Sequence, residues 1–257
     1  MAEHAAIPLD ERPRDAGMAD FASSRLEWRR LLAGMANPMD SLEVRWITPG
    51  PVTPAMREWF ARFPSGTETR DDAYLLRPPL RGLAVKLRNG SFLDLKAFLG
   101  SPGLIELPCG GRGTLELWRK WSFSGGNCTP REGSGAVLRW VVVHKERTGA
   151  WFPLASGDSA APGGRQAVQT GCAVELTAIS LGAAPYTSVG FEAFGAPELL
   201  RPALEHAIGP VFAVPPPPES GFIFSPGNSR SYTQWLHQPR DASQAAAGTT
   251  MRGSSLS

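Results

Sequence analysis

Between residues 41 and 194, charged side chains recur at every second position of short segments. In residues 114–123, for example, Glu116, Trp118 and Lys120 share one face, and the other face carries Leu115, Leu117, Trp121 and Phe123, with Arg119 as the exception. Side chains of a β-strand point alternately to the two faces of its sheet, so this spacing predicts strands with one apolar and one charged face. Seven segments are predicted to be strands: residues 41–47, 83–88, 92–99, 114–123, 137–147, 172–179 and 187–194.

The charged faces are compatible with two architectures. In a β-sandwich they would point to water, as one face of an antiparallel sheet commonly does. In a closed barrel they would line the lumen. Signs are mixed within single strands, and Trp118, Ala173 and Gly190 stand among the charges, whereas a solvated face carries mainly Ser, Thr, Lys and Glu. We therefore expect a mainly β (α+β) fold in which an antiparallel barrel encloses a charged interior.

An Asn-Gly pair joins two of the predicted strands. A three-residue loop over residues 88–90, with Gly90 in the left-handed conformation, pairs residue 86 with residue 92. In that register Lys86, Asp94 and Lys96 point to the same side. A two-residue turn would instead mix charged and apolar residues on one face, so the three-residue loop is the prediction.

Two helices are expected on the outside of the barrel. Thr53 is placed to cap a helix that begins at Pro54, and a second helix is expected to begin at Pro197. Apolar residues fall at helical spacing in both: Met56, Trp59, Phe60 and Phe63 in the first, and Leu199, Leu200, Leu204 and Ile208 in the second. A further short helix is predicted over residues 21–35.

With 257 residues and 42% hydrophobic content, the chain is long enough for one folded unit with a full core. We assign that unit to residues 25–213. Residues 1–24 and the Pro-, Gly- and Ser-rich residues 214–257 are expected to be largely disordered tails. The aromatic residues between 222 and 235 are unusual for a linker, and we expect them to pack on the barrel rather than to serve as a docking motif.

Charge and cysteine content restrict the partners and the compartment. The formal net charge of +2 is too small to indicate nucleic-acid binding. The three cysteines lack metal-ligand spacing and leave an odd count for pairing, which favours a reduced cytoplasmic protein. The sequence has no apolar stretch of about 18–20 residues, and its acidic N-terminus is unlike a signal peptide, so we expect a soluble protein without a membrane span.

The order of these segments resembles the CYTH, or triphosphate tunnel, superfamily. The segments that carry the resemblance, within residues 42–208, are EVRW, LDLK, ELWRKW, HKER, VELTAI and GFEAFG, followed by a helix. The resemblance implies an antiparallel eight-stranded tunnel whose basic residues bind polyphosphate and whose acidic residues hold Mg²⁺ or Mn²⁺. Members hydrolyse inorganic triphosphate, thiamine triphosphate or RNA 5′-triphosphate ends, and some cyclise ATP.

The resemblance also implies roles for particular residues. The implied substrate-binding residues are Arg45, Lys86, Lys96, Lys145 and Arg147; the implied metal ligands are Glu43, Glu175 and Glu192; and the implied catalytic residues are Glu116 and Lys120. Several cations in a water-poor channel would stabilise a triphosphate and the charge that develops on its leaving oxygen. Carboxylates are the hard oxygen ligands that Mg²⁺ prefers.

This chain departs from the family pattern where the metal would bind. The family's first strand reads E-x-E-x-K, whereas here Arg45 takes the place of the second acid and Ile47 that of the lysine. On the later strands, Glu175 and Glu192 have no acidic neighbour on the same face. Loss of anionic ligands raises the potential of the lumen, so phosphate binding is expected to persist more readily than metal-dependent turnover.

The leading hypothesis is a divergent tunnel protein that binds a phosphorylated or polyphosphate ligand, with metal-dependent triphosphatase activity as the implied chemistry. The alternative is a non-catalytic barrel that acts as a binding or adaptor module and meets a protein partner through its C-terminal tail. A lipocalin-like carrier of an apolar ligand is disfavoured, because such cavities are lined mainly by apolar residues.

Overall fold

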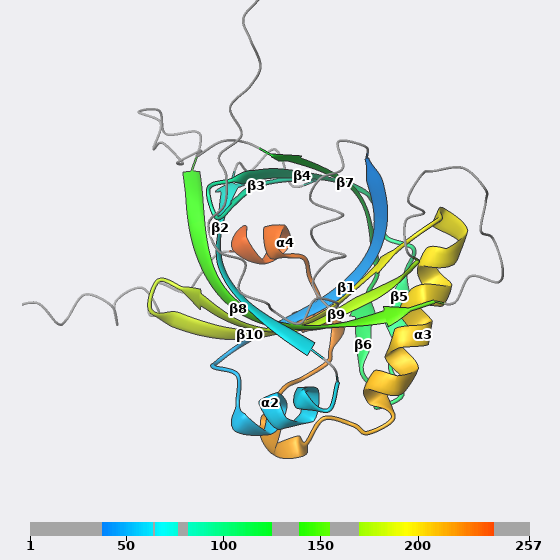
Figure 1. Ribbon diagram of the computed structural model, residues 1–257. Helices are drawn as coiled ribbons and strands as arrows, with labels where there is room; N and C mark the ends of the chain where they lie inside the picture. The colour runs from blue at the N-terminus through cyan, green and yellow to red at the C-terminus, as the bar shows by residue number, and fades with distance from the viewer. Residues whose placement is uncertain (1–37, 64, 77–81, 125–138, 155–169, 239–257) are drawn as a thin grey trace, which may run out of the picture.

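The computed structural model describes residues 38–63, 65–76, 82–124, 139–154 and 170–238. Eight strands form a closed antiparallel barrel in the order β1-β10-β9-β8-β2-β3-β4-β7 (Figure 1), which confirms the predicted fold. The barrel strands are β1 (Met39–Pro49), β2 (Ser65–Leu76), β3 (Leu83–Arg88), β4 (Phe92–Gly100), β7 (Glu116–Ser124), β8 (Arg139–Pro153), β9 (Gly171–Leu181) and β10 (Ala184–Phe194). The predicted helix over residues 21–35 and the tail of residues 1–24 lie outside the described residues.

Sequence patterning missed three strands. The long strand β2 pairs with β8 on one side and β3 on the other, so it is needed to close the barrel. The two others, β5 (Leu104–Glu106) and β6 (Arg112–Thr114), form a small separate hairpin. None of the helices in the described part of the chain combines the length and apolar character required to cross a membrane.

The hairpin between β3 and β4 has the predicted loop length but a different register. Arg88 pairs with Phe92, and Lys86 pairs with Asp94, so the loop comprises residues 89–91 rather than 88–90. Gly90 has the predicted positive φ, at 64°, and Asn89 also lies in the left-handed region, at 48°, which Asn tolerates better than most residues. Because the pairing shifts by two residues, every side chain keeps its predicted face.

Helices cover part of the outside of the barrel. In α2 (Pro54–Ala61), the Thr53 side chain accepts a hydrogen bond from the Met56 N–H, which confirms the predicted cap. The second helical segment begins at Pro197 as predicted, with a 3₁₀ turn (Pro197–Leu199) before α3 (Leu200–Phe212). Outward-facing side chains of β1, β9 and β10 form one buried cluster with α2 and α3. Both faces of these strands are therefore buried.

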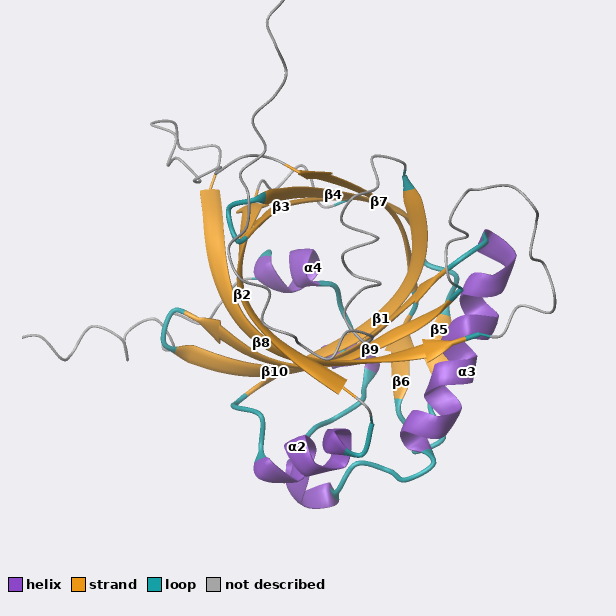
Figure 2. Cartoon of the chain, in the orientation of Figure 1, coloured by secondary structure: helices purple, strands orange, loops and turns teal. Residues whose placement is uncertain are grey.

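The folded unit continues beyond residue 213. Residues 214–238 include two 3₁₀ turns (Pro218–Ser220 and Pro226–Asn228) and the short helix α4 (Tyr232–Leu236). Figure 2 shows α4 inside the ring of strands. The aromatic residues pack as predicted: Phe224 contacts Trp46 with ring centroids 5.0 Å apart, and Trp235 contacts Tyr186 at 4.9 Å. The expected disorder of residues 214–257 is therefore wrong for residues 214–238.

Candidate functional site

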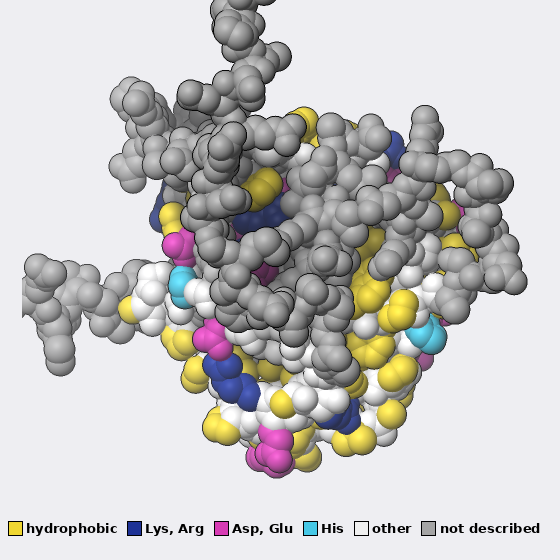
Figure 3. All heavy atoms as spheres, viewed as in Figure 1, with side chains coloured by type: hydrophobic (Ala, Val, Ile, Leu, Met, Phe, Trp, Pro, Cys, Tyr) yellow, Lys and Arg dark blue, Asp and Glu magenta, His cyan; other side chains and the backbone are white. Residues whose placement is uncertain are grey.

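The barrel encloses a charged cavity of about 100 Å³. Figure 3 shows basic side chains, in dark blue, in the area that the ring of strands surrounds in Figure 1. Inward-facing positions of the strands supply most of the lining, and residues 231–233 at the start of α4 complete it. The charged lining comprises eight basic residues, Arg45, Arg70, Lys86, Arg88, Lys96, Lys120, Lys145 and Arg147, and four acidic residues, Glu43, Asp94, Glu175 and Glu192.

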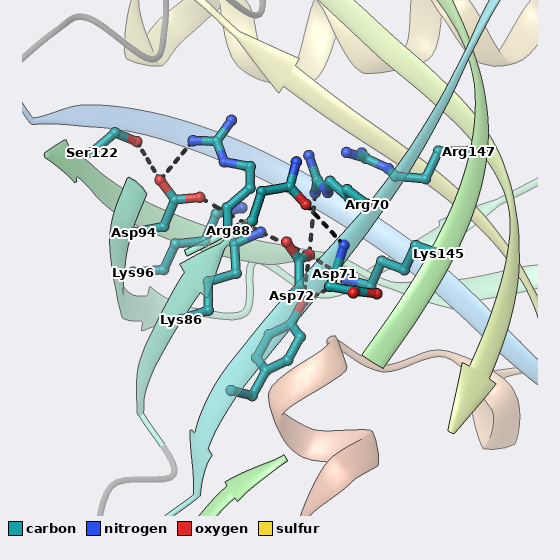
Figure 4. Close-up of polar contacts among 12 residues, drawn as sticks. Arg70, Asp71, Asp72, Lys86, Arg88, Asp94, Lys96, Ser122, Lys145 and Arg147 are labelled. Carbon is teal, nitrogen blue, oxygen red and sulfur yellow. Dashed lines mark hydrogen bonds and ion pairs between the residues drawn. The ribbon is translucent and has the colours of Figure 1, made fainter. Parts of the chain in front are cut away.

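Asp72 is the centre of one cluster of charges beside this cavity. It is fully buried on β2, and its Oδ2 accepts hydrogen bonds from Lys145 Nζ at 2.7 Å and from Lys86 Nζ and Arg70 Nη2 at 3.2 Å (Figure 4). Burial alone would raise the pKa of Asp72, but these three cations together hold it well below its usual range. The carboxylate therefore stays ionised and fixes three basic side chains.

A second buried carboxylate, Asp94 on β4, organises a neighbouring group. Its Oδ1 accepts hydrogen bonds from Ser122 Oγ at 2.7 Å and Arg88 Nη2 at 2.9 Å. Its Oδ2 lies 3.6 Å from Lys86 Nζ and 4.0 Å from Lys120 Nζ. Burial would raise the pKa of Asp94, but the surrounding cations lower it below the ordinary value. Lys120 makes the longest of the ion pairs described in the lumen, so its charge is the least neutralised by a direct contact.

Glu43 and Glu192 lie directly opposite each other on β1 and β10. The Lys96 ammonium contacts both carboxylates, with Nζ 2.8 Å from Glu192 Oε1 and in close contact with Glu43 Oε1. Burial would lower the pKa of Lys96, but the two glutamates raise it above its ordinary value. Lys96 therefore remains a cation between the two carboxylates.

Glu175 on β9 has different partners. Arg45 Nη2 lies 3.3 Å from Glu175 Oε2, and Arg147 contacts Oε1. Arg45 also donates a hydrogen bond to Ser188 Oγ at 3.1 Å. A Cβ atom at Gly190, which pairs with both Arg45 and Glu175, would lie 2.6 Å from the Arg45 guanidinium carbon. Glycine at this position therefore makes room for the ion pair across β10.

These contacts bear on whether a metal fits. Of the three carboxylates that the sequence resemblance assigned to a metal, Glu43 and Glu192 contact Lys96, whereas Glu175 contacts two arginines. Within the described residues, no group of three or more His, Cys, Asp or Glu side chains is arranged to hold a metal ion. Since Mg²⁺ and Mn²⁺ require several converging oxygen ligands, the lumen as arranged does not fit a divalent cation.

Helix α4 closes part of the lumen next to these charges. Ser231 caps the helix in a capping box with Gln234. The Tyr232 ring lies over Lys145, with Nζ 3.6 Å from the ring centroid, and over Arg45, with its guanidinium carbon at 4.7 Å. Cation–π contacts of this kind are attractive, so α4 is held by the same basic residues that line the cavity.

Nine of the ten residues singled out from the sequence line this one cavity; Glu116 does not. Instead, Glu116 Oε2 accepts a hydrogen bond from Trp118 Nε1 at 3.0 Å, and its carboxylate also interacts with the Gln234 side chain on α4. Burial raises the pKa of Glu116 above its ordinary value. As placed, Glu116 contacts the C-terminal helix rather than the open part of the lumen.

Four charged residues of the site are not among the site residues predicted from the sequence: Arg70, Asp72, Arg88 and Asp94, although the predicted hairpin places Asp94 on the charged face. The predicted hairpin places Arg88 where its strand meets the loop, and β2 is not among the predicted strands. Its sequence nevertheless carries the same signal as the other strands, because Glu68, Arg70, Asp72 and Tyr74 stand at alternate positions. Alternating charge over residues 65–76 is therefore a local signal that predicts this strand.

No protein-family model and no curated protein sequence matches this chain. Solved structures are similar to it at low identity. A conserved hypothetical protein from Pyrococcus furiosus is 13% identical, with 76% of this chain and 98% of that protein covered and a TM-score of 0.41. The Mimivirus capping enzyme triphosphatase is 11% identical, with coverage of 73% and 93% and a TM-score of 0.42. The S. pombe RNA triphosphatase Pct1 is 9% identical, with coverage of 81% and 93% and a TM-score of 0.34.

Triphosphatases are thus among the solved structures that this chain is similar to.

Proposed function

We propose that the lumen binds a phosphate-containing anion, with inorganic polyphosphate as the best fit. The observation that carries this proposal is the set of eight basic side chains around one small cavity. Ammonium and guanidinium groups make charge-assisted hydrogen bonds to phosphate oxygens, and Arg can do so in a bidentate way. A compact, highly charged ligand would therefore gain several such contacts at once.

The buried carboxylates support this proposal by holding the cations in place. Asp72 fixes three basic side chains and Asp94 contacts three, so the cavity is lined by charges whose positions are set before a ligand enters. Preorganised charges lose little entropy when the ligand binds. They also interact more strongly than the same charges in water, because the surrounding dielectric constant is lower.

Cavity size favours a small ligand. About 100 Å³ is well below the roughly 300–1,000 Å³ typical of pockets for drug-sized organic molecules. The charged lining also argues against an apolar ligand. The adaptor hypothesis depended on an exposed C-terminal docking motif, yet Phe224 and Trp235 are each only 8% exposed. We therefore propose ligand binding rather than protein docking through residues 222–235.

Calorimetric titration of the full chain with inorganic triphosphate tests the proposal. In a Lys120→Ala variant, binding should weaken by about 1.5–3 kcal/mol, the value of a hydrogen bond to a charged group. Lys120 suits this test because its nearest described carboxylate oxygen is 4.0 Å away, so its removal disturbs few internal contacts.

The matched control is Arg57→Ala. It removes one positive charge from α2, where the arginine pairs with Glu146 and both side chains are largely exposed. Its triphosphate affinity should equal that of the wild type. Absence of binding by the wild-type chain, or equal weakening by both variants, would contradict a phosphate site in the lumen.

A further inference from the structure

Three glutamates form a row across adjacent strands inside the barrel. Glu43 on β1 pairs directly with Glu116 on β7 and with Glu192 on β10. Side chains that face each other across an antiparallel pair have Cβ atoms about 4.5–5.5 Å apart, and like charges in such positions are destabilising. All three residues point into the lumen, where their side chains are largely buried. Burial and the neighbouring Glu192 raise the pKa of Glu43 accordingly, and a cation between the carboxylates relieves the remaining repulsion.

The chain supplies that cation itself. Lys96 lies on β4, which is separated from β1 by β7, and its ammonium contacts both Glu43 and Glu192. Outside this row, Glu175 on β9 pairs with two cations, Arg45 and Arg147. Arg45 is two residues from Glu43 on the same face of β1. The three glutamates that the sequence resemblance assigned to a metal, Glu43, Glu175 and Glu192, thus each contact a basic side chain of this protein.

We propose that Lys96 is an internal cation that takes the place of a divalent metal between Glu43 and Glu192, so that the lumen binds its anionic ligand without metal. The ligand part of this statement rests on the proposed function. The exclusion of metal is a property of the protein alone and can be measured without any phosphate ligand.

The physical reason is competition for the same oxygens. Mg²⁺ requires near-octahedral oxygen coordination at about 2.0–2.1 Å. An ion that entered between Glu43 and Glu192 would have to displace the Lys96 ammonium and leave it buried beside a doubly charged metal. Removal of the ammonium would leave two facing carboxylic groups able to accept a divalent cation.

The test is a titration of the full-length protein with Mn²⁺ alone, followed by electron paramagnetic resonance. Wild-type protein should bind no stoichiometric Mn²⁺. Lys96→Met should bind one Mn²⁺ ion, with a dissociation constant at least about tenfold below that of any residual binding by the wild type, because the competing buried charge is gone. Mn²⁺ should also raise the melting temperature of Lys96→Met and not that of the wild type. If Lys96→Met does not fold, Lys96→Gln carries the same expectation.

The matched control is Lys120→Met, which removes the same charge from the neighbouring position without freeing Glu43 or Glu192. It should behave like the wild type toward Mn²⁺. Stoichiometric Mn²⁺ binding by the wild type would overturn the proposal. So would failure of the folded Lys96 variant to bind the metal, or equal binding by the Lys120 variant.

A second titration separates this proposal from the proposed function. Wild-type protein should bind inorganic triphosphate in the presence of EDTA at least as tightly as in the presence of Mg²⁺, because Mg²⁺ complexes free triphosphate and reduces its negative charge. Binding only in the presence of Mg²⁺ would overturn the internal-cation proposal. Absence of binding under both conditions would instead refute the proposed function, and the Mn²⁺ titration would still decide the role of Lys96.

Discussion

The two parts of the barrel interior differ in what fills them. Around the cavity, buried carboxylates contact basic side chains. Around Trp235 and Leu236, at the C-terminal end of α4, the inward positions of the strands are apolar or aromatic. A single strand can serve both parts: β8 contributes Val141 and Val143 to the apolar cluster and then Lys145 to the charged cavity.

The apolar cluster and the charged cavity are expected to contribute differently to the free energy of folding. Burial of apolar side chains is favourable by about 25 cal/mol for each Å² removed from water. Buried ion pairs contribute little net stability, because the desolvation of the charges opposes their attraction. The apolar cluster around Trp235 is therefore expected to stabilise the barrel, whereas the charged cavity is expected to contribute little net stability, which fits the proposed binding of an anion.

The largest expected effect comes from removal of the C-terminal segment. A chain that ends after Pro215 would lose both Phe224 and Trp235, and loss of a buried large aromatic side chain typically costs about 3–5 kcal/mol. Two such losses approach the total stability of a domain, roughly 5–15 kcal/mol. We expect this truncation to abolish cooperative thermal unfolding, measured by circular dichroism. This replaces the sequence-based expectation that the barrel would fold without these residues.

The matched control lies in the same segment. Ile223 is 61% exposed, so Ile223→Ala should change the free energy of unfolding by no more than about 0.5 kcal/mol. If the truncated chain unfolded cooperatively near the wild-type melting temperature, α4 would not be needed for stability. That result would contradict the idea that the apolar end of the lumen stabilises the barrel.

A smaller effect is expected at the charged end. Asp72→Asn would leave Arg70, Lys86 and Lys145 without their shared carboxylate. Breaking a buried ion pair by removing one partner typically costs about 3–5 kcal/mol, which urea denaturation can measure. Asp71→Asn is the neighbouring control, because the Asp71 side chain is largely exposed and pairs with His144 at the surface. Equal stability of the two variants would show that the buried network is not structurally required.

The pH dependence of stability should show the smallest effect. Asp72 and Asp94 have folded-state pKa values below their ordinary ones. Their contribution is fully present above the unfolded pKa of about 3.9 and is lost as the pH falls through the lower folded values. Melting temperatures should therefore drop progressively below about pH 4, and less steeply in Asp72→Asn. A variant with the acid dependence of the wild type would contradict the ionised state of Asp72.

Much of the site could be predicted because period-two alternation is local. The charged faces of β3, β4, β7 and β8 follow from the order of residues, and a register error of two in the β3–β4 hairpin left every face unchanged. β2 is not among the predicted strands, so its buried residue Asp72 is not among the predicted site residues either. That segment begins at Ser65, separated by three residues from the end of α2 at Ala61, and its Ser-Gly start is typical of a loop rather than a strand.

Contacts between distant strands could not be predicted from local pattern. The sequence shows that Arg45 replaces an acid and Ile47 replaces a lysine, but not what these residues touch. In the barrel Ile47 joins the apolar cluster around Trp235, and Arg45 crosses Gly190 to reach Glu175. These partners are separated by more than a hundred residues and meet only when the sheet closes.

The sequence by itself determined that this protein would form antiparallel strands with one charged face, because side-chain alternation is a property of each strand alone. Only the tertiary structure decided how those charges are used. Closure of the barrel placed Lys96 between Glu43 and Glu192 and enclosed α4 in the lumen. The reason is that ion pairing and burial depend on distances between strands, which are set by closure and register and not by the order of residues within any one strand.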